Sequence, residues 1–333
     1  MVYSHGSAHY RSRTIETVRT PMLAIFESIL PVFLLILAGN LLRRTPLINQ
    51  AAWPGLDQLG YWVLYPALLF ITIVNADFTG LQLDAMMAAL LVSIAVICSF
   101  TYASWPVLAR TGLVLESEFS SVFQTTARWN SFIALAVAQK IFLPAGMAVV
   151  ALVMLVIIIP LNIASTFVVT RFADRTANWR RVAWNIATNP LILAMLAGIV
   201  MRAMPFRLYA PLDETIDLAG RAALGMGLIA IGASLRPGDL MQLRFAMWLP
   251  TVLKLVLFPA LLVATAMAFG VSGVQLSYLA LCGAVPTALN GYLLARQLGG
   301  DAELYAAIAT LQTGISFLTI PAVLAVTAQL SAG

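Results

Sequence analysis

The sequence predicts an all-α polytopic membrane protein in which ten transmembrane helices form two inverted repeats of five. Three observations predict this class: an apolar composition, a succession of apolar segments long enough to cross a bilayer, and residue matches that recur at one spacing. Of the 333 residues, 61% are hydrophobic and 10% are charged, and the mean hydropathy is +0.92. Soluble domains average about 25% charged residues, so a soluble globular class is excluded.

The net charge of +5 does not indicate a nucleic-acid partner in so apolar a chain. It is typical of arginines in cytoplasmic loops that face anionic lipid. Cys98 and Cys282 both lie in apolar segments and are interpreted as small buried hydrophobes. The two histidines, His5 and His9, lie near the N-terminus, so neither a metal site nor a cofactor is expected.

Ten apolar segments come close to the roughly 20 residues that a helix needs to cross a bilayer. They are expected at about residues 24–42, 58–74, 86–109, 119–139, 147–170, 189–204, 212–235, 245–269, 274–295 and 303–328. The sixth is short, and an amphipathic segment over 179–187 is expected to precede it. Residues 1–23 form a polar tail without a signal-peptide core, and Met22 is an alternative start because the first span follows directly.

An internal duplication divides these spans into five plus five. Matched residues recur 159 to 161 positions apart: Ala38-Gly39 with Ala197-Gly198, Asp57 and Gly60 with Asp217 and Gly220, Asn130 with Asn290, and Pro160 with Pro321. Because five is odd, the second copy must enter the membrane from the opposite side, as in many secondary transporters. The first repeat is expected over 24–170, a cytoplasmic linker over 171–188, and the second repeat over 189–328.

The distribution of basic residues predicts the orientation. Loops after odd-numbered spans hold Arg43, Arg44, Arg110, Arg171, Arg175, Arg180, Arg181, Arg236, Arg244 and Arg296, whereas loops after even-numbered spans hold only Lys140, Arg202 and Arg207. The positive-inside rule therefore places the odd loops in the cytoplasm and both termini outside, in a cell inner (plasma) membrane. The arginines of residues 1–21 contradict this orientation unless translation starts at Met22.

Spans four and nine carry polar and helix-breaking residues at their centres. Span nine contains Pro286, Thr287, Asn290 and Gly291, and span four contains the equivalent Asn130. Proline and glycine free backbone groups that lipid cannot satisfy, so a broken helix at membrane depth indicates a transport site lined by protein or water. The alternative is a simple proline kink, which is common in membrane helices.

Three side chains near these breaks suit an anion. Arg128 offers a guanidinium for bidentate recognition of a carboxylate, and Asn130 and Asn290 offer amide donors beside half-helix N-termini. The alternatives are a structural ion pair or snorkelling for Arg128, and helix capping for the two asparagines. Lys254 is placed closer to a span end, where snorkelling to the interface is the expected behaviour.

Further polar residues are weaker candidates. Gln312, Thr313, Ser316 and Thr319 share one helical stripe of span ten, which predicts either a cavity lining or interhelical hydrogen bonds. Asp57 and Asp217 stand near the starts of spans two and seven, as candidates for proton coupling or as plain surface carboxylates.

Enzyme signatures are missing from the sequence. It contains no paired-aspartate diphosphate motif, no H-E-x-x-H, no G-x-S-x-G and no P-loop. We therefore expect a carrier that is not an enzyme, with a small carboxylate substrate and the lipid bilayer as partners and with a homodimer left open. The alternative class is a non-transporting membrane sensor or interaction protein.

Several segments together resemble the auxin efflux carrier (AEC) family, the bacterial relatives of plant PIN auxin exporters. They are Ile29–Arg44, Val63–Phe70, Asn189–Ala194, Ala230–Leu235, Lys254–Ala260, and the Pro286 segment running to Leu318–Pro321. The resemblance implies ten helices in two inverted repeats, spans four and nine crossing at their broken centres, and a scaffold domain beside an elevator-type transport domain. It also implies carriage of organic anions such as auxin-like acids, malate or malonate.

The resemblance further maps the family's crossover asparagine onto Asn290, and onto Asn130 by the repeat. The crossover proline maps onto Pro286, whereas Arg128-Trp129 stands where span four would carry a proline. A sodium/bile-acid-type symporter of related fold is the alternative within the same architecture.

Overall fold

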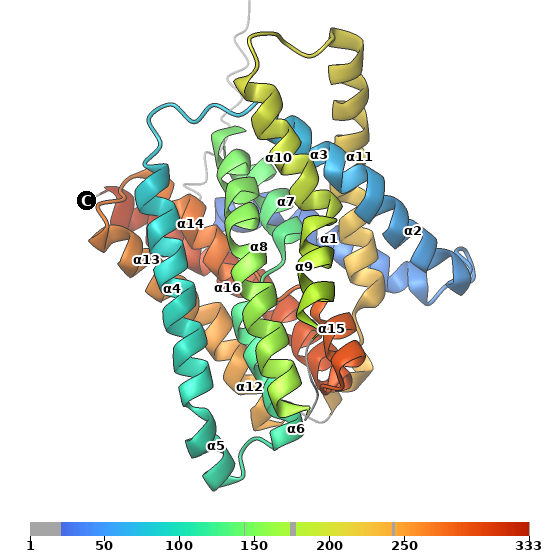
Figure 1. Cartoon of the computed structure of the whole chain (residues 1–333), viewed down its shortest axis with the longest axis vertical. Coiled ribbons are helices and arrows are strands. Elements are labelled where there is room, and N and C mark those ends of the chain that lie inside the picture. The colour runs from blue at the N-terminus through green and yellow to red at the C-terminus, as the bar shows by residue number, and fades with distance from the viewer. Residues whose placement is uncertain (1–20, 143, 174–177, 242–243, 333) are drawn as a thin grey trace, which may run out of the picture.

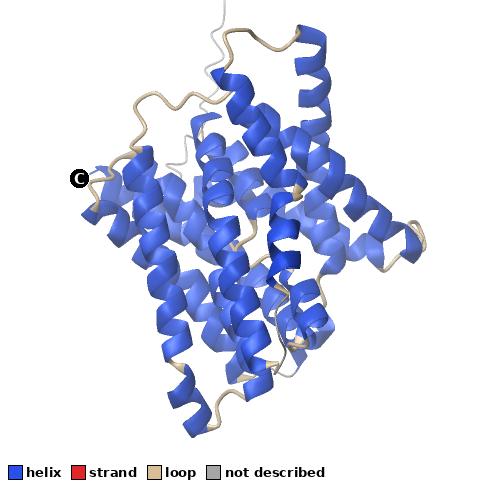
Figure 2. Ribbon diagram, in the orientation of Figure 1, coloured by secondary structure: helices blue, strands red, loops and turns tan. Residues whose placement is uncertain are grey.

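The computed structural model describes residues 21–142, 144–173, 178–241 and 244–332, and these residues contain helices and loops but no strand (Figures 1 and 2). The α-helices are α1 (Pro21–Arg43), α2 (Trp53–Leu59), α3 (Tyr65–Val74), α4 (Leu83–Ala103), α5 (Trp105–Thr111), α6 (Glu116–Ala127), α7 (Ser131–Ile141), α8 (Pro144–Phe172), α9 (Trp179–Ala187), α10 (Pro190–Ala203), α11 (Ala210–Ser234), α12 (Phe245–Val252), α13 (Phe258–Ala268), α14 (Val274–Ala284), α15 (Gly291–Leu298) and α16 (Ala302–Ala332). The short helical turns are η1 (Gln50–Ala52), η2 (Gly60–Leu64), η3 (Pro237–Met241) and η4 (Leu253–Leu257).

Seven helices in the described residues are long and apolar enough to cross a membrane, and an eighth results if the bent pair α9 and α10 is one span. The predicted amphipathic segment over 179–187 is confirmed as α9, which meets α10 at 46°. The segments expected at 119–139 and 274–295 are each divided into two short helices, α6 with α7 and α14 with α15. The polar tail lies almost wholly outside the described residues, as do residues 174–177 of the linker.

The helices pack as two groups. The α1/α11 group contains α1, α2, α3, α10 and α11, and the α14/α16 group contains α4, α6, α7, α8 and α12 to α16. In Figure 1, α2, α3 and α11 lie toward the right and α4, α13 and α14 toward the left. The groups meet where α1 packs on α7 and α16, and where α3 packs on α8. Phe317 of α16 bridges this boundary by contacting Phe26 and Phe33 of α1 at ring-centroid distances of 4.7 and 4.9 Å.

Glycines allow the closest helix crossings within the α1/α11 group. A Cβ added to Gly39 would lie 2.0 Å from the carbonyl oxygen of Ile229, and one added to Gly232 would lie 1.8 Å from that of Ile36. The Asn40 side chain strengthens this crossing by donating to the Gly232 and Leu235 carbonyls at 3.0 and 3.1 Å. Small residues at membrane-helix interfaces let backbones approach in this way.

The proposed repeat has a counterpart in this packing. Gly198 is the predicted equivalent of Gly39. A Cβ added to Gly198 would lie 3.1 Å from the Phe70 carbonyl oxygen and 3.1 Å from the Cβ of Ile73, both on α3. Thus α1 packs on α11 and α10 packs on α3, each through an equivalent glycine. This pairing is the one that a duplication of about 160 residues predicts, although the inverted repeat itself stays a prediction.

Two prolines produce the π-helical turns. Each π-turn, η2 and η4, ends one residue before an aromatic-proline pair, Tyr65-Pro66 and Phe258-Pro259. Proline has no N–H to donate and its ring clashes with the carbonyl four residues earlier, so the preceding turn widens to i→i+5 bonding. The spans continue through both widened turns.

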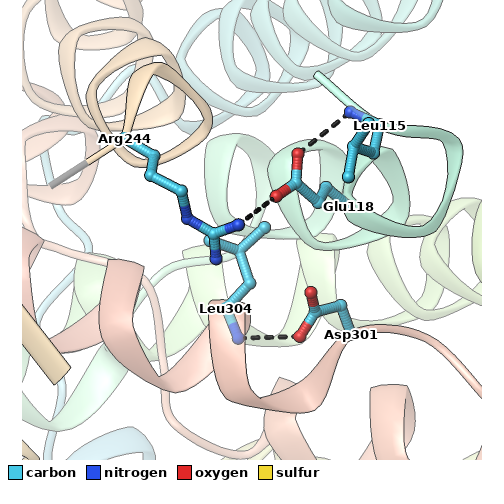
Figure 3. Close-up of polar contacts among 5 residues, drawn as sticks. All are labelled: Leu115, Glu118, Arg244, Asp301 and Leu304. Carbon is cyan, nitrogen blue, oxygen red and sulfur yellow. Dashed lines mark hydrogen bonds and ion pairs between the residues drawn. The ribbon is translucent and has the colours of Figure 1, made fainter. Parts of the chain in front are cut away.

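Polar contacts join the ends of three helices in the α14/α16 group (Figure 3). Glu118 is buried near the start of α6, where it accepts the Leu115 N–H at 2.9 Å and pairs with Arg244 Nη1 at 2.7 Å. Asp301 caps the start of α16 by accepting the Leu304 N–H at 2.9 Å, and its carbonyl accepts the Ser121 hydroxyl. The starts of α6, α12 and α16 are therefore tied together.

Candidate functional site

The interruptions predicted in spans four and nine lie against each other. The first break is Arg128–Asn130, between α6 and α7, and the second break is Val285–Asn290, between α14 and α15. The Asn130 backbone N–H donates to the Pro286 carbonyl at 2.7 Å. A backbone hydrogen bond thus joins two segments that lie about 160 positions apart in the sequence.

Asn130 closes the start of α7. Its Oδ1 accepts the N–H groups of Phe132 and Ile133, each at 3.2 Å, and the side chain is buried. An N-cap of this kind satisfies helix donors that have no partner within the helix. Asn130 therefore acts as a helix cap, which was the alternative to a role in anion binding. Its carboxamide oxygen is already hydrogen-bonded to its own helix.

Gln312 of α16 supports the second break. Its Oε1 accepts the Thr287 N–H at 2.9 Å, while its Nε2 donates to the carbonyls of Thr125 on α6 and Pro250 on α12 at 3.1 and 3.2 Å. The amide is fully buried, and so is Thr287. One side chain therefore connects the second break to the half-helix that precedes the first break.

Tyr305 of α16 also supports the second break. Its hydroxyl donates to the Ala288 carbonyl at 2.5 Å and lies 3.1 Å from Thr287 Oγ1. The ring lies so close to Gly291, the first residue of α15, that an added Cβ there would stand 2.2 Å from the hydroxyl. Glycine at this position is required by the contact.

Arg128 carries an unsatisfied cation beside the first break. Its Nη2 donates to Asn162 Oδ1 of α8 at 3.0 Å, and its buried Nη1 has no hydrogen-bond partner. Within the described residues no carboxylate pairs with this guanidinium, so the predicted alternative of a structural ion pair has no counterpart there. Arg128 is half-buried, and a buried guanidinium nitrogen is costly to leave without a partner, so the site is suited to an incoming anion.

A row of polar side chains that the sequence analysis did not single out extends from Arg128. Ser120 and Gln124 precede it at four-residue spacing on α6, and Ser165 lies on the facing helix α8. Their buried hydroxyl and amide atoms have no hydrogen-bond partner within the part of the chain that the structure describes. Buried polar groups are usually satisfied, so unpaired ones in a row suit water or a polar solute. The four-residue spacing was the only available signal in the sequence.

A cavity of about 200 Å³ opens beside the second break, between the two helix groups. It is lined by Arg43 of α1, Ser234 at the end of α11, Arg236, and Leu289, Tyr292 and Ala306 from the other group. The Arg236 guanidinium carbon lies 5.2 Å from the centre of the Tyr292 ring. In the sequence Arg43 and Arg236 indicate only the topology, and their place in this cavity was not predicted.

The remaining predicted site residues are dispersed. Asn290 is exposed, precedes α15 and makes no side-chain capping bond, unlike its partner Asn130. Ser316 is buried and donates to the Thr313 carbonyl of its own helix at 2.7 Å. Asp217 forms an ion pair with Arg221 at 2.5 Å, and Asp57 is exposed on α2 and interacts electrostatically with Arg43. Neither carboxylate reaches the breaks.

The expectation that Lys254 snorkels to the interface is wrong. Lys254 is fully buried in η4, with its amine 4.4 Å from the centre of the Phe258 ring. The helix starts at Phe245, so Lys254 lies about 14 Å along it, at a rise of about 1.5 Å per residue. Lys254 was expected near a span end, whereas the helical span continues well beyond it on both sides. Of the two cysteines, Cys282 is buried as predicted and Cys98 is only half-buried.

Comparisons with known proteins give a consistent result. Residues 180–324 match the model of a family described as membrane transport protein. A putative malonate transporter of Rhizobium meliloti (strain 1021) is 28% identical over 144 residues, which cover 43% of this chain and 45% of that protein, less than half of each. The uncharacterized transporter YfdV of Escherichia coli (strain K12) is 24% identical over 285 residues, which cover 82% of this chain and 88% of that protein. These matches confirm the resemblance predicted from the sequence.

Proposed function

From the premise that this chain is a multi-pass membrane transport protein similar to the auxin efflux carrier family, we propose that it is a secondary-active carrier of small organic anions. The single observation that carries the proposal is the contact between the two breaks, Asn130 N–H to Pro286 carbonyl, beside the unpaired guanidinium of Arg128. Irregular backbone at membrane depth is tolerated where it is buried in protein or lines a substrate path.

The charges near the breaks favour an anion as the substrate. Arg128 has a free, buried Nη1, and Arg43 and Arg236 line the cavity beside the second break. Asn290 borders this cavity through its neighbour Leu289, and its side chain is not engaged in capping. We infer that a small mono- or dicarboxylate first meets the two cavity arginines and then binds between Arg128 and Asn290, where Pro286 and Thr287 shape the backbone. The name of the Rhizobium meliloti relative makes malonate the first candidate to test.

The two helix groups suggest how such a substrate crosses. Both breaks belong to the α14/α16 group, which faces α1 through the Phe317 contacts. An elevator-type movement of the α14/α16 group along the α1/α11 group would carry the site across the membrane as one body. We place the cavity at the cytoplasmic side of the cell inner membrane, with both termini outward, because its arginines belong to the odd-numbered loops.

A thermal-shift screen of the purified protein tests the substrate class. The panel contains malonate, malate and indole-3-acetate, with choline and glucose as cationic and neutral solutes. A ligand that binds only the folded state stabilises it by RT ln(1 + [L]/Kd), or about 2.7 kcal/mol at 100 times Kd. We expect at least one carboxylate to raise the melting temperature and Arg128→Gln to reduce that shift strongly.

The matched control is Arg110→Gln, because Arg110 is an exposed arginine on α5, outside both breaks. This variant should keep the full carboxylate shift. If only choline or glucose stabilises the wild type, or if Arg128→Gln leaves the shift unchanged, the proposed anion site is wrong.

Crosslinking with a bis-maleimide reagent, which joins thiols too far apart for a disulfide, tests the movement. In a background with Cys98→Ala and Cys282→Ala, the pair Phe33→Cys and Phe317→Cys joins the two groups, and the pair Phe142→Cys and Tyr278→Cys joins residues within one group. Crosslinking of the first pair should stop transport but leave the carboxylate thermal shift intact, and crosslinking of the second pair should allow transport. Full transport with the first pair crosslinked would exclude the elevator movement.

A further inference from the structure

Lys254 is a buried titratable group that the anion site does not use. It lies in the π-turn η4, midway along the span formed by α12, η4 and α13, and its side chain is fully buried. The amine has no hydrogen-bond partner, and its nearest aromatic contact is the Phe258 ring at 4.4 Å. π-turns inside helices occur frequently at functional sites.

No carboxylate of the described residues interacts with the amine. The turn η4 packs against α6, α12, α13, α14 and α16. Among the described residues, the titratable groups that interact with the amine are two thiols, Cys98 of α4 and Cys282 of α14. An ammonium ion without a hydrogen-bond acceptor is strongly disfavoured in an apolar interior, whereas a neutral amine is tolerated.

The helix of Lys254 is connected to the second break. The carbonyl of Pro250, four residues earlier, accepts Gln312 Nε2, and the same amide holds the Thr287 N–H. Cys282, beside the amine, is three residues before the second break on α14. A rearrangement that hydrates the amine would therefore also disturb the segment that supports the proposed substrate site.

We propose that Lys254 is the proton-binding site that couples proton movement to the transport of the carboxylate. In the conformation described here the amine is neutral; in a conformation that admits water to η4, its lone pair takes a proton from water and the ammonium forms. The ammonium loses that proton to water when η4 is hydrated from the other side of the membrane, and the neutral amine then returns through the packed conformation. Proton binding favours the hydrated conformation, because the packed one excludes the charged form.

The charge balance gives this arrangement a purpose. Malonate and malate as dianions would keep one uncompensated charge, whereas a monocarboxylate carries one negative charge that one proton on Lys254 compensates, so that pair crosses without net charge movement. A membrane potential acts on net charge, so it would neither drive nor oppose this pair. This inference rests on the proposed function and replaces Asp57 and Asp217 as the coupling candidates, since one is exposed and the other is paired with Arg221.

A substrate-independent experiment tests proton binding directly. The sequence contains two lysines, Lys140 and Lys254, so ¹⁵N-lysine labelling gives two side-chain signals, and Lys140→Arg assigns them. With the protein in detergent micelles, the Lys254 Nζ signal should be that of a neutral amine at a pH where the exposed Lys140 gives an ammonium signal. An ammonium signal for Lys254 throughout the range in which Lys140 is protonated would overturn the proposal.

Transport measurements test the coupling. Proteoliposomes containing a pH-sensitive dye are given labelled malonate, malate or indole-3-acetate, and the initial ratio of protons to carboxylate is measured. We expect Lys254→Met and Lys254→Arg to lose the accompanying proton uptake, since neither side chain exchanges a proton in this range. Lys140→Gln, a change at an exposed lysine, should keep the wild-type ratio. Melting curves of each variant identify any that fails to fold.

The outcomes separate the two proposals. Carboxylate uptake by the wild type without proton uptake, or unchanged coupling in folded Lys254→Met and Lys254→Arg, overturns the assignment of Lys254 alone. No uptake of any of the three carboxylates by the wild type contradicts the proposed function, and the ¹⁵N signal then still decides whether Lys254 binds a proton.

Discussion

The two breaks occupy equivalent positions in the predicted repeat but differ in how they are built. In the first break the asparagine is buried and caps α7 with two hydrogen bonds. In the second break the equivalent Asn290 is exposed and caps nothing, and the segment is held from outside by Gln312 and Tyr305 of α16. The asparagine of the first break thus caps the helix that follows it, whereas the second break is supported by side chains of a neighbouring helix.

This difference suggests that the two breaks have different roles in substrate binding. The self-capped first break supplies a fixed half-helix and the cation of Arg128, whose Nη1 remains free. The second break borders the cavity and leaves the Asn290 amide available. A pocket that must bind and release a substrate needs one rigid wall and one wall that can change its contacts, because binding must differ between the two conformations.

The largest expected effect comes from removing the external support of the second break. Gln312→Leu should lower the free energy of unfolding by about 3 kcal/mol, because the buried Thr287 N–H and the Thr125 and Pro250 carbonyls lose their partner. Denaturation with sodium dodecyl sulfate in mixed micelles measures it. A loss no greater than that of a surface substitution would mean that α16 does not support this break.

A smaller effect is expected at the first break. Asn130→Ala should lower the free energy of unfolding by about 1 to 2 kcal/mol, since two buried donors of α7 lose their cap. Asn130→Ser supplies a neutral capping oxygen and should recover most of that loss if the loss reflects capping. Equal destabilisation by alanine and serine would argue against a capping role.

Tyr305→Phe should have a still smaller effect, about 1 kcal/mol, because it removes one hydroxyl that serves Ala288 and Thr287. It should also make the second break more dynamic, which hydrogen exchange at the amides of residues 287–291 would detect. Exchange that increases equally at residues 128–133 of the first break would contradict the separate support of the two segments.

The smallest effect on stability is expected at Asn290. Asn290→Ala should change the free energy of unfolding by less than about 0.5 kcal/mol, as for other exposed positions, yet weaken the carboxylate thermal shift. The opposite pattern, a large loss of stability with unchanged ligand stabilisation, would show that the two asparagines have the same structural role.

The positions of the elements could be predicted from the sequence because hydropathy and helix breakers act locally. Pro286 and Gly291 identified the second break, and the repeat spacing then identified the first break at Asn130, which has no proline. The amphipathic helix α9 was predicted over 179–187, before the short sixth span. The inverted order of the repeats and the membrane orientation remain predictions.

The roles of side chains could not be predicted in this way because they depend on which helices become neighbours. The residues next to Asn130 and Asn290 in the sequence do not show that the first caps its own helix and the second does not. Gln312 is one of four polar residues on one helical stripe, and the sequence does not indicate that it is the one that supports the second break. Lys254 was expected near a span end and at the interface, but it is fully buried. Hydropathy predicts the length of a span but not which of its sides faces protein. Arg43 and Arg236 come together with Tyr292 only when the ends of α1 and α11 meet α15.

Counterflow in proteoliposomes tests the central claim most directly, that the meeting point of the two breaks carries a small carboxylate across the membrane. Vesicles loaded with unlabelled malonate receive a trace of labelled malonate, and uptake is compared among wild type, Arg128→Gln and the exposed-site control Arg110→Gln. The account predicts rapid uptake by the wild type and the control, and at least a tenfold loss in Arg128→Gln, the equivalent of about 1.4 kcal/mol. Uptake by Arg128→Gln equal to that of the control, at equal amounts of folded protein, would contradict it.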